Sequence, residues 1–435
     1  MRVSGSGPGD RGRRAVAVLA GASAMAVLAA GAAACSGGPD GADAVQLTLS
    51  PAGGGGGAAL RPDSPIAVHA HQGTIENVTV SGGAAPMEGD LNADRTRWRS
   101  RWTLEPGATY TVDATAIGKD GRTRTVTDRF TTAKVAQTNA VKIEAPFSRE
   151  TVGVGMPIIV HFNRAVQDRR AVEQALEVRS DKTVEGAWRW FGDKEVVFRP
   201  RQYWPAQTNV TFQAHLSGVR TGGDVYGGKN TALGFKIGDS HVSTAGEDSH
   251  KMVVKINGRK ARTIPTSMGR GGARMFTTTN GVHLTMDKQD PTVMTSGWMG
   301  VGPGSAGYYS LTVYKAVQIS DSGEYVHSAP WSVGAQGSEN VSHGCINISP
   351  SNAAWFYKMS QRGDPVTVTG TSRELEPENG WGYWQIGWNE WVKGSAMGRS
   401  VSTAPHLDAA TLSAQKQQRE RDATKQAEKQ RAEGN

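Results

Sequence analysis

Cysteine is almost absent from this sequence, because the 435 residues contain only Cys35 and Cys345. Secreted chains usually place cysteines in pairs, so an unpaired cysteine in an oxidising compartment is either reactive or accidental. Long apolar runs are also lacking. Residues 15–30 are apolar and follow four arginines, but a membrane span needs about 20 apolar residues and different flanks. The basic start, the short apolar run and the small residues after it predict a secretory signal over residues 1–34.

A strong excess of charge of one sign is missing as well. The formal net charge is +8, and no basic patch interleaved with aromatic residues occurs, so nothing argues for a nucleic-acid partner. This modest positive charge fits contact with an anionic polymer of the cell envelope. A third metal ligand is lacking near His69 and His71, which we therefore interpret as ordinary strand histidines.

The residues before the first cysteine are similar to a bacterial lipobox, in which cysteine becomes the lipidated first residue of the mature protein. They read Ala32-Ala33-Ala34-Cys35, and an ordinary cleavage site is the alternative. Small and polar residues follow and suit a tether, so residues 35–44 are predicted to be a lipid-anchored tether. We expect the protein in the cell envelope, held on the outer face of the cytoplasmic membrane. A lipidated Cys35 would leave Cys345 without a disulfide partner.

A short repeat suggests how the chain is organised. The pattern Pro-Ile-x-Val-His begins at Pro65 and again at Pro157, and tryptophan-rich strand patterns follow each copy. Two units of about 90 to 100 residues with short alternating strands and turn signals predict tandem immunoglobulin-like β-sandwiches. We assign them to residues 45–138 and 139–239.

Residues 240–372 are predicted to be a third unit that is mostly β. An apolar strand pattern runs into Asn257 and Gly258, a pair that favours a type I′ hairpin turn. One helical pattern covers residues 349–363, where Ser349 can cap the start and Gly363 can end it.

The segment after this unit contains four tryptophans at helical spacing, Trp381, Trp384, Trp388 and Trp391. Such a stripe is typical of a packing face, so residues 373–395 are predicted to form a small element docked on the third unit. Residues 396–435 are polar, which predicts a solvated helix or disorder.

The second cysteine lies in a polar stretch, NVSHGCINISP, over residues 340–350. A cysteine nucleophile needs a nearby base and donors aimed at the charge that develops on the substrate. His343 suits substrate contact, because side chains two residues apart in an extended segment diverge, whereas His327 closes a predicted strand and could return beside Cys345. Gly344 would let the backbone N–H groups of Gly344 and Cys345 form an oxyanion hole.

Residues 327–350, HSAPWSVGAQGSENVSHGCINISP, resemble the signature of L,D-transpeptidases with a YkuD-type catalytic domain. That signature is a histidine, a spacer and S/T-H-G-C-x-N, and residues 342–347 match each fixed position. Two immunoglobulin-like units, a lipobox and a tryptophan-rich C-terminal element are also the architecture of actinobacterial members. The resemblance therefore covers nearly the whole mature chain and implies a mainly β fold.

The resemblance implies specific roles. Cys345 would be the nucleophile, His327 the general base, and Ser328 would orient His327 through its backbone carbonyl. The amides of Gly344 and Cys345 would form the oxyanion hole. A mobile flap is expected within residues 293–310. The substrate contacts would come from Ser342, His343, Asn347, Met294, Tyr308 and Trp331.

The implied reaction is acyl transfer on peptidoglycan. Cys345 would attack the third residue of a donor tetrapeptide stem, expel the terminal D-alanine and form a thioester. A diamino acid of a neighbouring acceptor stem would then attack the thioester and give a 3→3 cross-link. No metal or organic cofactor is expected, and carbapenem-type β-lactams would acylate the same cysteine.

Two other interpretations are open. Cys345 could be a buried small hydrophobe in a non-catalytic envelope-binding lipoprotein, although its polar neighbours are unusual for a core strand. His327, His343 and Cys345 could instead bind zinc, although no carboxylate that would support such ligands lies close in sequence.

Overall fold

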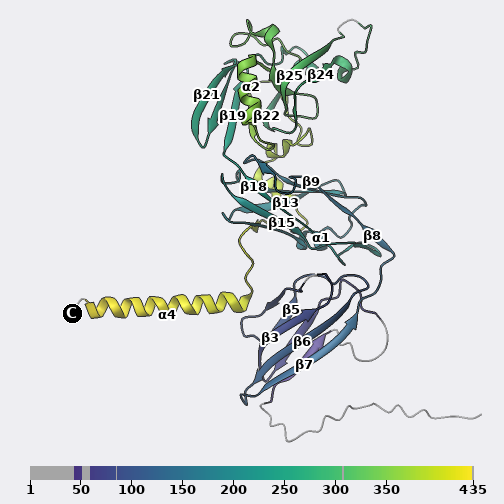
Figure 1. Cartoon of the computed structure of the whole chain (residues 1–435), viewed down its shortest axis with the longest axis vertical. Helices are drawn as coiled ribbons and strands as arrows, with labels where there is room; N and C mark the ends of the chain where they lie inside the picture. Colours follow the sequence, from purple (N-terminus) through teal and green to yellow (C-terminus); the bar gives the residue numbers. More distant parts are fainter. Residues whose placement is uncertain (1–43, 51–58, 85, 306–307, 434–435) are drawn as a thin grey trace, which may run out of the picture. The chain divides into compact units, whose positions relative to one another are not determined.

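A computed structural model describes residues 44–50, 59–84, 86–305 and 308–433. The predicted lipidation site Cys35 lies outside these residues. The described chain is mainly β, which confirms the expected fold class, and it contains two sandwiches followed by a third unit (Figure 1). Among the described residues, no helix combines the length and the apolar character needed to span a membrane.

The first sandwich consists of two antiparallel sheets around one core. Alternate residues of its long strand Thr109–Gly118 are buried, among them Tyr110 and Val112, as expected for a strand with one face on a core. One sheet has the order β1 (Gln46–Ser50), β2 (Ala67–His71), β5 (Arg97–Ser100) and β4 (Gly89–Leu91), and the other has β3 (Gly73–Ser81), β6 (Thr109–Gly118) and β7 (Thr123–Thr131).

The second sandwich repeats this plan with more strands. The repeated sequence pattern forms β2 in the first sandwich and β11 in the second, and both are flanked by a partner on each side. The first sheet has the order β30 (Val401–Ser402), β13 (Glu185–Phe191), β14 (Glu195–Pro200), β11 (Ile158–Phe162) and β9 (Val141–Ala145). The second has β10 (Thr151–Val152), β18 (Thr231–Ile237), β15 (Asn209–Ala214) and β12 (Leu176–Ser180). Helix α1 (Arg169–Gln174) and a small sheet of β16 (Arg220–Gly222), β17 (Val225–Gly227) and β8 (Gln137–Asn139) complete it.

The third unit contains two sheets. Its larger sheet includes the predicted hairpin, in which Asn257 and Gly258 both have positive φ, 50° and 78°, as a type I′ turn requires. The strand order is β21 (Arg259–Pro265), β20 (Lys251–Ile256), β19 (His241–Gly246), β28 (Pro365–Thr369), β22 (Thr279–Leu284) and β29 (Arg373–Glu374). The smaller sheet has β23 (Lys288–Gln289), β25 (Ser310–Gln318), β26 (Tyr325–Ser328) and β27 (Ile346–Ile348), with β24 (Thr292–Thr295) paired to β25. Short 3-10 turns are η1 (Arg274–Phe276), η2 (Ser296–Met299), η3 (Pro330–Ser332) and η4 (Gly382–Gln385).

The predicted helix of the third unit is α2 (Pro350–Met359), which lies against β25 and β26 (Figure 1). Ser349 occupies the N-cap position, but its side chain makes no capping hydrogen bond. The helix ends before Gly363, because Ser360 already adopts an extended conformation. The existence of the helix is thus confirmed, whereas its predicted end is four residues too late.

The tryptophan stripe docks mainly on the second sandwich, not on the third unit as predicted. Trp391 Nε1 donates to Ala187 O at 2.9 Å, and Trp384 Nε1 donates to Gly155 O at 2.9 Å. The guanidinium of Arg199 lies 4.5 Å from the ring centroids of both tryptophans. The tryptophans pack on the second sandwich because this cation and these carbonyl groups belong to it.

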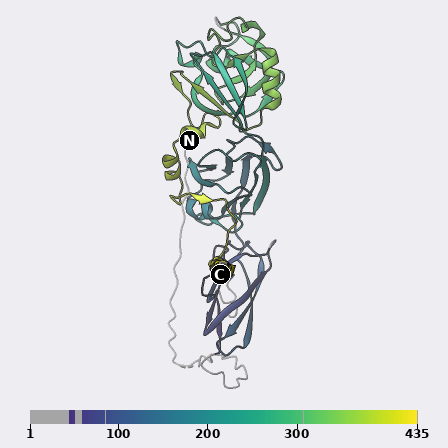
Figure 2. The ribbon, with the colours of Figure 1, turned by 90° about the vertical axis from the view of Figure 1, so that its left-hand side faces the viewer.

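The chain after the stripe continues along the second sandwich. Helix α3 (Trp388–Lys393) is followed by β30, which adds a strand to β13, and the yellow arrow of β30 lies on that sandwich in Figure 2. The buried carboxylate of Glu173 accepts hydrogen bonds from Ser395 Oγ and from the backbone N–H of Ala396. The polar tail then forms helix α4 (Ala409–Glu433), one of the two states that its composition predicts.

We predict that Trp391→Ala lowers the free energy of unfolding by about 3–5 kcal/mol, the usual cost of truncating a buried tryptophan. The side chain is 0% exposed and also loses its hydrogen bond to Ala187. Urea unfolding followed by circular dichroism measures the change. Trp388→Ala is the matched control on the same helix, and its half-buried side chain should cost clearly less. Equal costs would show that the stripe is not anchored through Trp391.

Candidate active site

Two neighbouring strands bring His327 beside Cys345. Strand β26 runs parallel to β27, with His327 opposite Asn347 and Val326 opposite Ile346. Cys345 immediately precedes β27. Because neighbouring strands lie about 5 Å apart, this register brings the cysteine and the histidine close together. The predicted return of the His327 strand beside Cys345 is confirmed.

Both side chains line one pocket of about 360 Å³. Three of its apolar side chains, Leu311, Trp331 and Val341, are large and exposed, which is typical of a binding groove rather than of a closed core. The lining residues are Met294, Tyr309, Ser310, Leu311, Val313, His327, Trp331, Val341, Ser342, His343, Cys345 and Asn347. Polar groups therefore converge on the cysteine at the bottom of an apolar groove.

His327 is held in one orientation. Its Nδ1 lies 2.9 Å from Ser328 O, and because a carbonyl can only accept, Nδ1 carries the proton and Nε2 is left as the basic nitrogen. Ser328 thus makes the backbone contact that the resemblance implies. The imidazole is only 3% exposed, and its burial lowers the pKa of His327 despite this hydrogen bond. The resting base is therefore neutral at pH 7.

Cys345 rests as a thiol. Burial raises its pKa to about 12, a backbone hydrogen bond from Tyr325 opposes this, and the charge of Glu324 adds to it. The sulfur lies 3.6 Å from Gly323 O, to which the S–H donates. An acid this weak must lose its proton to a base during attack, because little thiolate exists beforehand.

The turn before the cysteine needs glycine. Gly344 has φ +130°, a conformation that residues with a Cβ rarely adopt. Its N–H donates to Ser342 Oγ at 3.1 Å, and Ser342 Oγ donates to Cys345 O at 2.6 Å. The Ser342 hydroxyl therefore shapes the turn. It also accepts the hydrogen bond of the Gly344 N–H at rest. This bond must break before that N–H can donate to an oxyanion.

His343 faces Arg270 and two aromatic rings. Arg270 Nη1 donates to His343 Nε2 at 2.8 Å, and the rings of Phe276 and Tyr309 lie 5.2 Å and 5.1 Å from the imidazole. Burial and the Arg270 charge both lower the pKa of His343. A nitrogen that already accepts from arginine is poorly placed to take the thiol proton, so this geometry agrees with a lining role.

All but one of the residues predicted to contact substrate line the pocket. Met294 and Trp331 line the pocket, and the Trp331 ring centroid lies 6.0 Å from that of His327. Asn347 also lines the pocket and donates to Ser332 Oγ at 3.1 Å. Tyr308 is not on the wall, and Tyr309 takes its place, because successive residues of an extended segment point to opposite sides.

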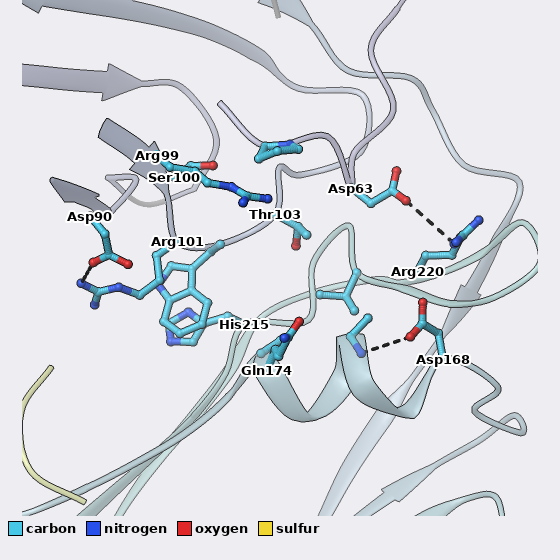
Figure 3. Close-up of a pocket in the computed structure, with 15 residues that line it drawn as sticks. Asp63, Asp90, Arg99, Ser100, Arg101, Thr103, Asp168, Gln174, His215 and Arg220 are labelled. Atoms are coloured by element: carbon cyan, nitrogen blue, oxygen red, sulfur yellow. Dashed lines mark hydrogen bonds and ion pairs between the residues drawn. The ribbon is translucent and has the colours of Figure 1, made fainter. Parts of the chain in front are cut away.

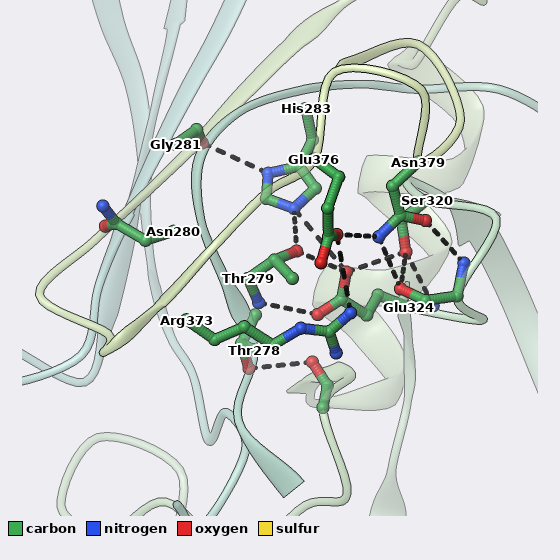
Figure 4. A network of polar contacts seen from close by, with 12 residues as sticks. Thr278, Thr279, Asn280, Gly281, His283, Ser320, Glu324, Arg373, Glu376 and Asn379 are labelled. Atoms are coloured by element: carbon green, nitrogen blue, oxygen red, sulfur yellow. Dashed lines mark hydrogen bonds and ion pairs between the residues drawn. The ribbon is translucent and has the colours of Figure 1, made fainter. Parts of the chain in front are cut away.

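A buried polar network behind the cysteine was missed by sequence reasoning. Glu324 accepts from Thr279 and Ser320, and His283 contacts Thr279 (Figure 4). Glu324 and Thr279 are 45 residues apart, so no local spacing reveals the contact. The one available signal was a charged residue inside the apolar strand pattern that ends at His327.

A larger pocket of about 530 Å³ is lined by residues of both sandwiches and shares no residue with the cysteine pocket (Figure 3). Its wall includes Trp102 stacked on His215, with ring centroids 3.7 Å apart, and the ion pair of Asp63 with Arg220. It contains no cysteine. Within the ranges that the structure describes, no group of three histidine, cysteine or carboxylate side chains is arranged to hold a metal ion.

Comparison with known proteins identifies the families to which the two parts of the chain are similar. The model of the bacterial Ig domain matches residues 57–220, and the model of the L,D-transpeptidase catalytic domain, YkuD, matches residues 241–368. The solved structure of the LD transpeptidase LdtMt1 in complex with imipenem is 37% identical, with a TM-score of 0.46, and the match covers 53% of this chain and 99% of that one.

Two curated relatives match along most of the chain. L,D-transpeptidase 2 of Mycobacterium tuberculosis (strain CDC 1551 / Oshkosh) is 38% identical over 354 residues, which is 81% of this chain and 85% of the relative. L,D-transpeptidase 5 of Mycobacterium tuberculosis (strain ATCC 25618 / H37Rv) is 35% identical over 364 residues, covering 81% and 78%. With Cys345 and His327 together in a matching YkuD domain, the chain belongs to the L,D-transpeptidases, a family of acyltransferase enzymes.

Proposed function

We propose that this protein forms 3→3 cross-links in peptidoglycan through an acyl-enzyme on Cys345. The observation that carries the proposal is the pairing of β26 with β27. It places Cys345 and His327 in one pocket, while the bond from Nδ1 to Ser328 O leaves Nε2 of His327 as the basic nitrogen. A thiol, an oriented neutral base and a groove for an extended ligand are the parts that acyl transfer needs.

In the first step, the thiol attacks the carbonyl carbon of the third residue of a tetrapeptide stem. His327 Nε2 takes the S–H proton as the S–C bond forms, and the negative charge moves to the carbonyl oxygen near the backbone amides of Gly344 and Cys345. The C–N bond then breaks, and the proton passes from His327 to the amine of the departing D-alanine. A thioester on Cys345 remains.

In the second step, an amine of a diamino acid on a neighbouring stem attacks the thioester. His327 accepts a proton from this amine and returns it to the sulfur, so the products are an amide cross-link and the original thiol. Water would compete with the amine. The described residues of the expected flap, 293–305 and 308–310, include Met294, Tyr309 and Ser310 of the groove wall, and we expect the flap to exclude water.

Two further parts of the proposal concern location and inhibition. A lipid on Cys35 would hold the protein at the outer face of the cytoplasmic membrane, with the two sandwiches between the anchor and the third unit along the chain.

A relative has been solved in complex with imipenem. We expect carbapenem-type β-lactams to acylate Cys345 in the same groove, because opening of the lactam ring is also attack on a carbonyl carbon.

The decisive experiment incubates the purified full-length protein with a disaccharide-tetrapeptide and analyses the mixture by mass spectrometry. We expect an acyl-enzyme at Cys345, free D-alanine and a cross-linked dimer, and none of these with Cys345→Ala. A folded wild-type protein that gives neither acyl-enzyme nor dimer would contradict the proposed function.

A second prediction separates the two histidines. His327→Ala should slow acylation of Cys345 by about 10²- to 10⁴-fold, the usual value of a general base. His343→Ala should cost less, because it removes a wall of the site and not the base. Imipenem acylation rates, measured by intact-protein mass spectrometry, give the comparison. The larger loss in His343→Ala, or inhibition of the wild type by a chelator, would overturn these roles.

A third prediction concerns pH. Because burial lowers the pKa of His327, its neutral form persists below pH 6.5, so acylation by imipenem should decline only at more acidic pH. Because burial raises the pKa of Cys345 to about 12, alkylation of the free enzyme by iodoacetamide should keep rising above pH 9. An alkylation midpoint near the ordinary thiol value of about 8.5 would contradict this assignment.

A further inference from the structure

The two neighbours of Glu324 contact the nucleophile. Gly323 O lies 3.6 Å from Cys345 Sγ, and the backbone of Tyr325 makes a hydrogen bond to the same cysteine. The side chain of Glu324, between them, is buried, does not line the pocket and belongs to the polar network of Figure 4. The contacts that fix the Glu324 side chain therefore also fix the backbone of residues 323–325, which contacts the Cys345 sulfur.

The carboxylate is held by several donors. Oε1 accepts from Thr279 N at 2.7 Å, and Oε2 accepts from Thr279 Oγ1 at 2.6 Å and from Ser320 Oγ at 2.7 Å. Burial alone would raise the pKa of Glu324, but His283, Thr279 and Ser320 together lower it, so the group is ionised. A buried charge with this many partners is costly to disturb, because any lost partner leaves it unsatisfied.

The same network reaches the other side of the cysteine. Thr278, next to Thr279, donates through Oγ1 to Gly344 O at 2.8 Å and accepts from Gly269 N at 2.9 Å. His283 lies with Nε2 2.7 Å from Thr279 Oγ1 and Nδ1 3.2 Å from Gly281 O, which fixes the start of β22. Residues 278–279 thus connect the carboxylate of Glu324 to the backbone of Gly344.

We propose that Glu324 is a positioning residue of the cysteine site, whose buried carboxylate fixes the segment 323–325 behind the Cys345 sulfur and, through Thr278 and Thr279, the Gly344 carbonyl beside it. Its consequence for cross-linking rests on the proposed function. Glu324 itself touches neither groove nor substrate. It acts by keeping the Cys345 sulfur and the Cys345 backbone amide in the geometry that attack requires. A displacement of about 1 Å from that geometry can lower the rate by about 10²-fold.

The charge of Glu324 gives the proposal a specific readout. His283 faces it from β22, with Nε2 3.7 Å from Oε2, and Cys345 faces it from the turn before β27. Arg373 and Glu376, themselves 3.6 Å apart, border the same network (Figure 4). Since the negative charge of Glu324 raises the pKa of the Cys345 thiol, its removal should ease thiolate formation even while it loosens the site.

Glu324→Gln tests both effects with a side chain of nearly the same shape. Its amide oxygen can still accept from one donor, but its NH₂ group cannot accept from the Thr279 and Ser320 hydroxyls. We expect the kcat of transpeptidation to fall by about 10- to 100-fold, with a much smaller change in KM. We also expect the pH curve of iodoacetamide alkylation of Cys345 to move to lower pH.

Glu374→Gln is the matched control, because Glu374 is an exposed carboxylate of neighbouring β29 that accepts from the side-chain amide of Asn280 at 2.9 Å. It should change neither readout.

Ser320→Ala removes a single donor to Oε2 and keeps the test available if Glu324→Gln does not fold. This variant should give a smaller loss of kcat while the thiol curve moves in the opposite direction, to higher pH, because the carboxylate loses a stabilising partner and the charge remains.

The outcomes separate the two proposals. Alkylation needs no peptidoglycan substrate, so a shifted curve in Glu324→Gln supports the link between this carboxylate and the thiol, on which the positioning role rests, even if the wild type shows no cross-linking and the proposed function fails. An active wild type with an unchanged Glu324→Gln overturns the positioning role. A loss of kcat with an unmoved alkylation curve also overturns it, because that result identifies general destabilisation.

Discussion

The parallel pairing of β26 with β27 is the contact on which the site depends. Parallel neighbours cannot be joined by a tight hairpin and need a crossover connection of a dozen or more residues. In this chain the crossover is residues 329–345, and it supplies Trp331, Val341, Ser342 and His343 to the pocket wall. The topology that aligns the cysteine and the histidine therefore also provides the groove in front of them.

Burial acts on the acid and the base of this pair in opposite directions. It raises the pKa of Cys345 and lowers that of His327, so both are neutral at rest and no ion pair has to be maintained in the resting site. In the proposed mechanism, charge separation is deferred until a carbonyl group is present to take up the developing negative charge. A resting thiol is also a weaker target for adventitious oxidation than a thiolate.

Sequence reasoning succeeded where structure is determined locally. The turn before Cys345 requires glycine at position 344, and the Asn257-Gly258 pair favours the type I′ turn that it forms. The alternation of apolar residues along the strands determines which side chains form the sandwich cores. It failed where a choice is made between distant partners. The tryptophan stripe could be recognised as a packing face, but only the buried cation of Arg199 decides which unit it covers. The role of Glu324 depends on Thr279, which the fold brings to it from another sheet, so no local spacing reveals their contact.

The docking of the C-terminal segment changes how the third unit is mechanically attached. The chain enters this unit from β18 through β19, leaves it after β29 and pairs with the second sandwich again at β30. The third unit is thus connected to the second sandwich by the chain segments at both of its ends. A force applied to the third unit would therefore be shared between two connecting segments. Two connections resist rotation of the unit as well as its extension, whereas a single connection resists extension alone.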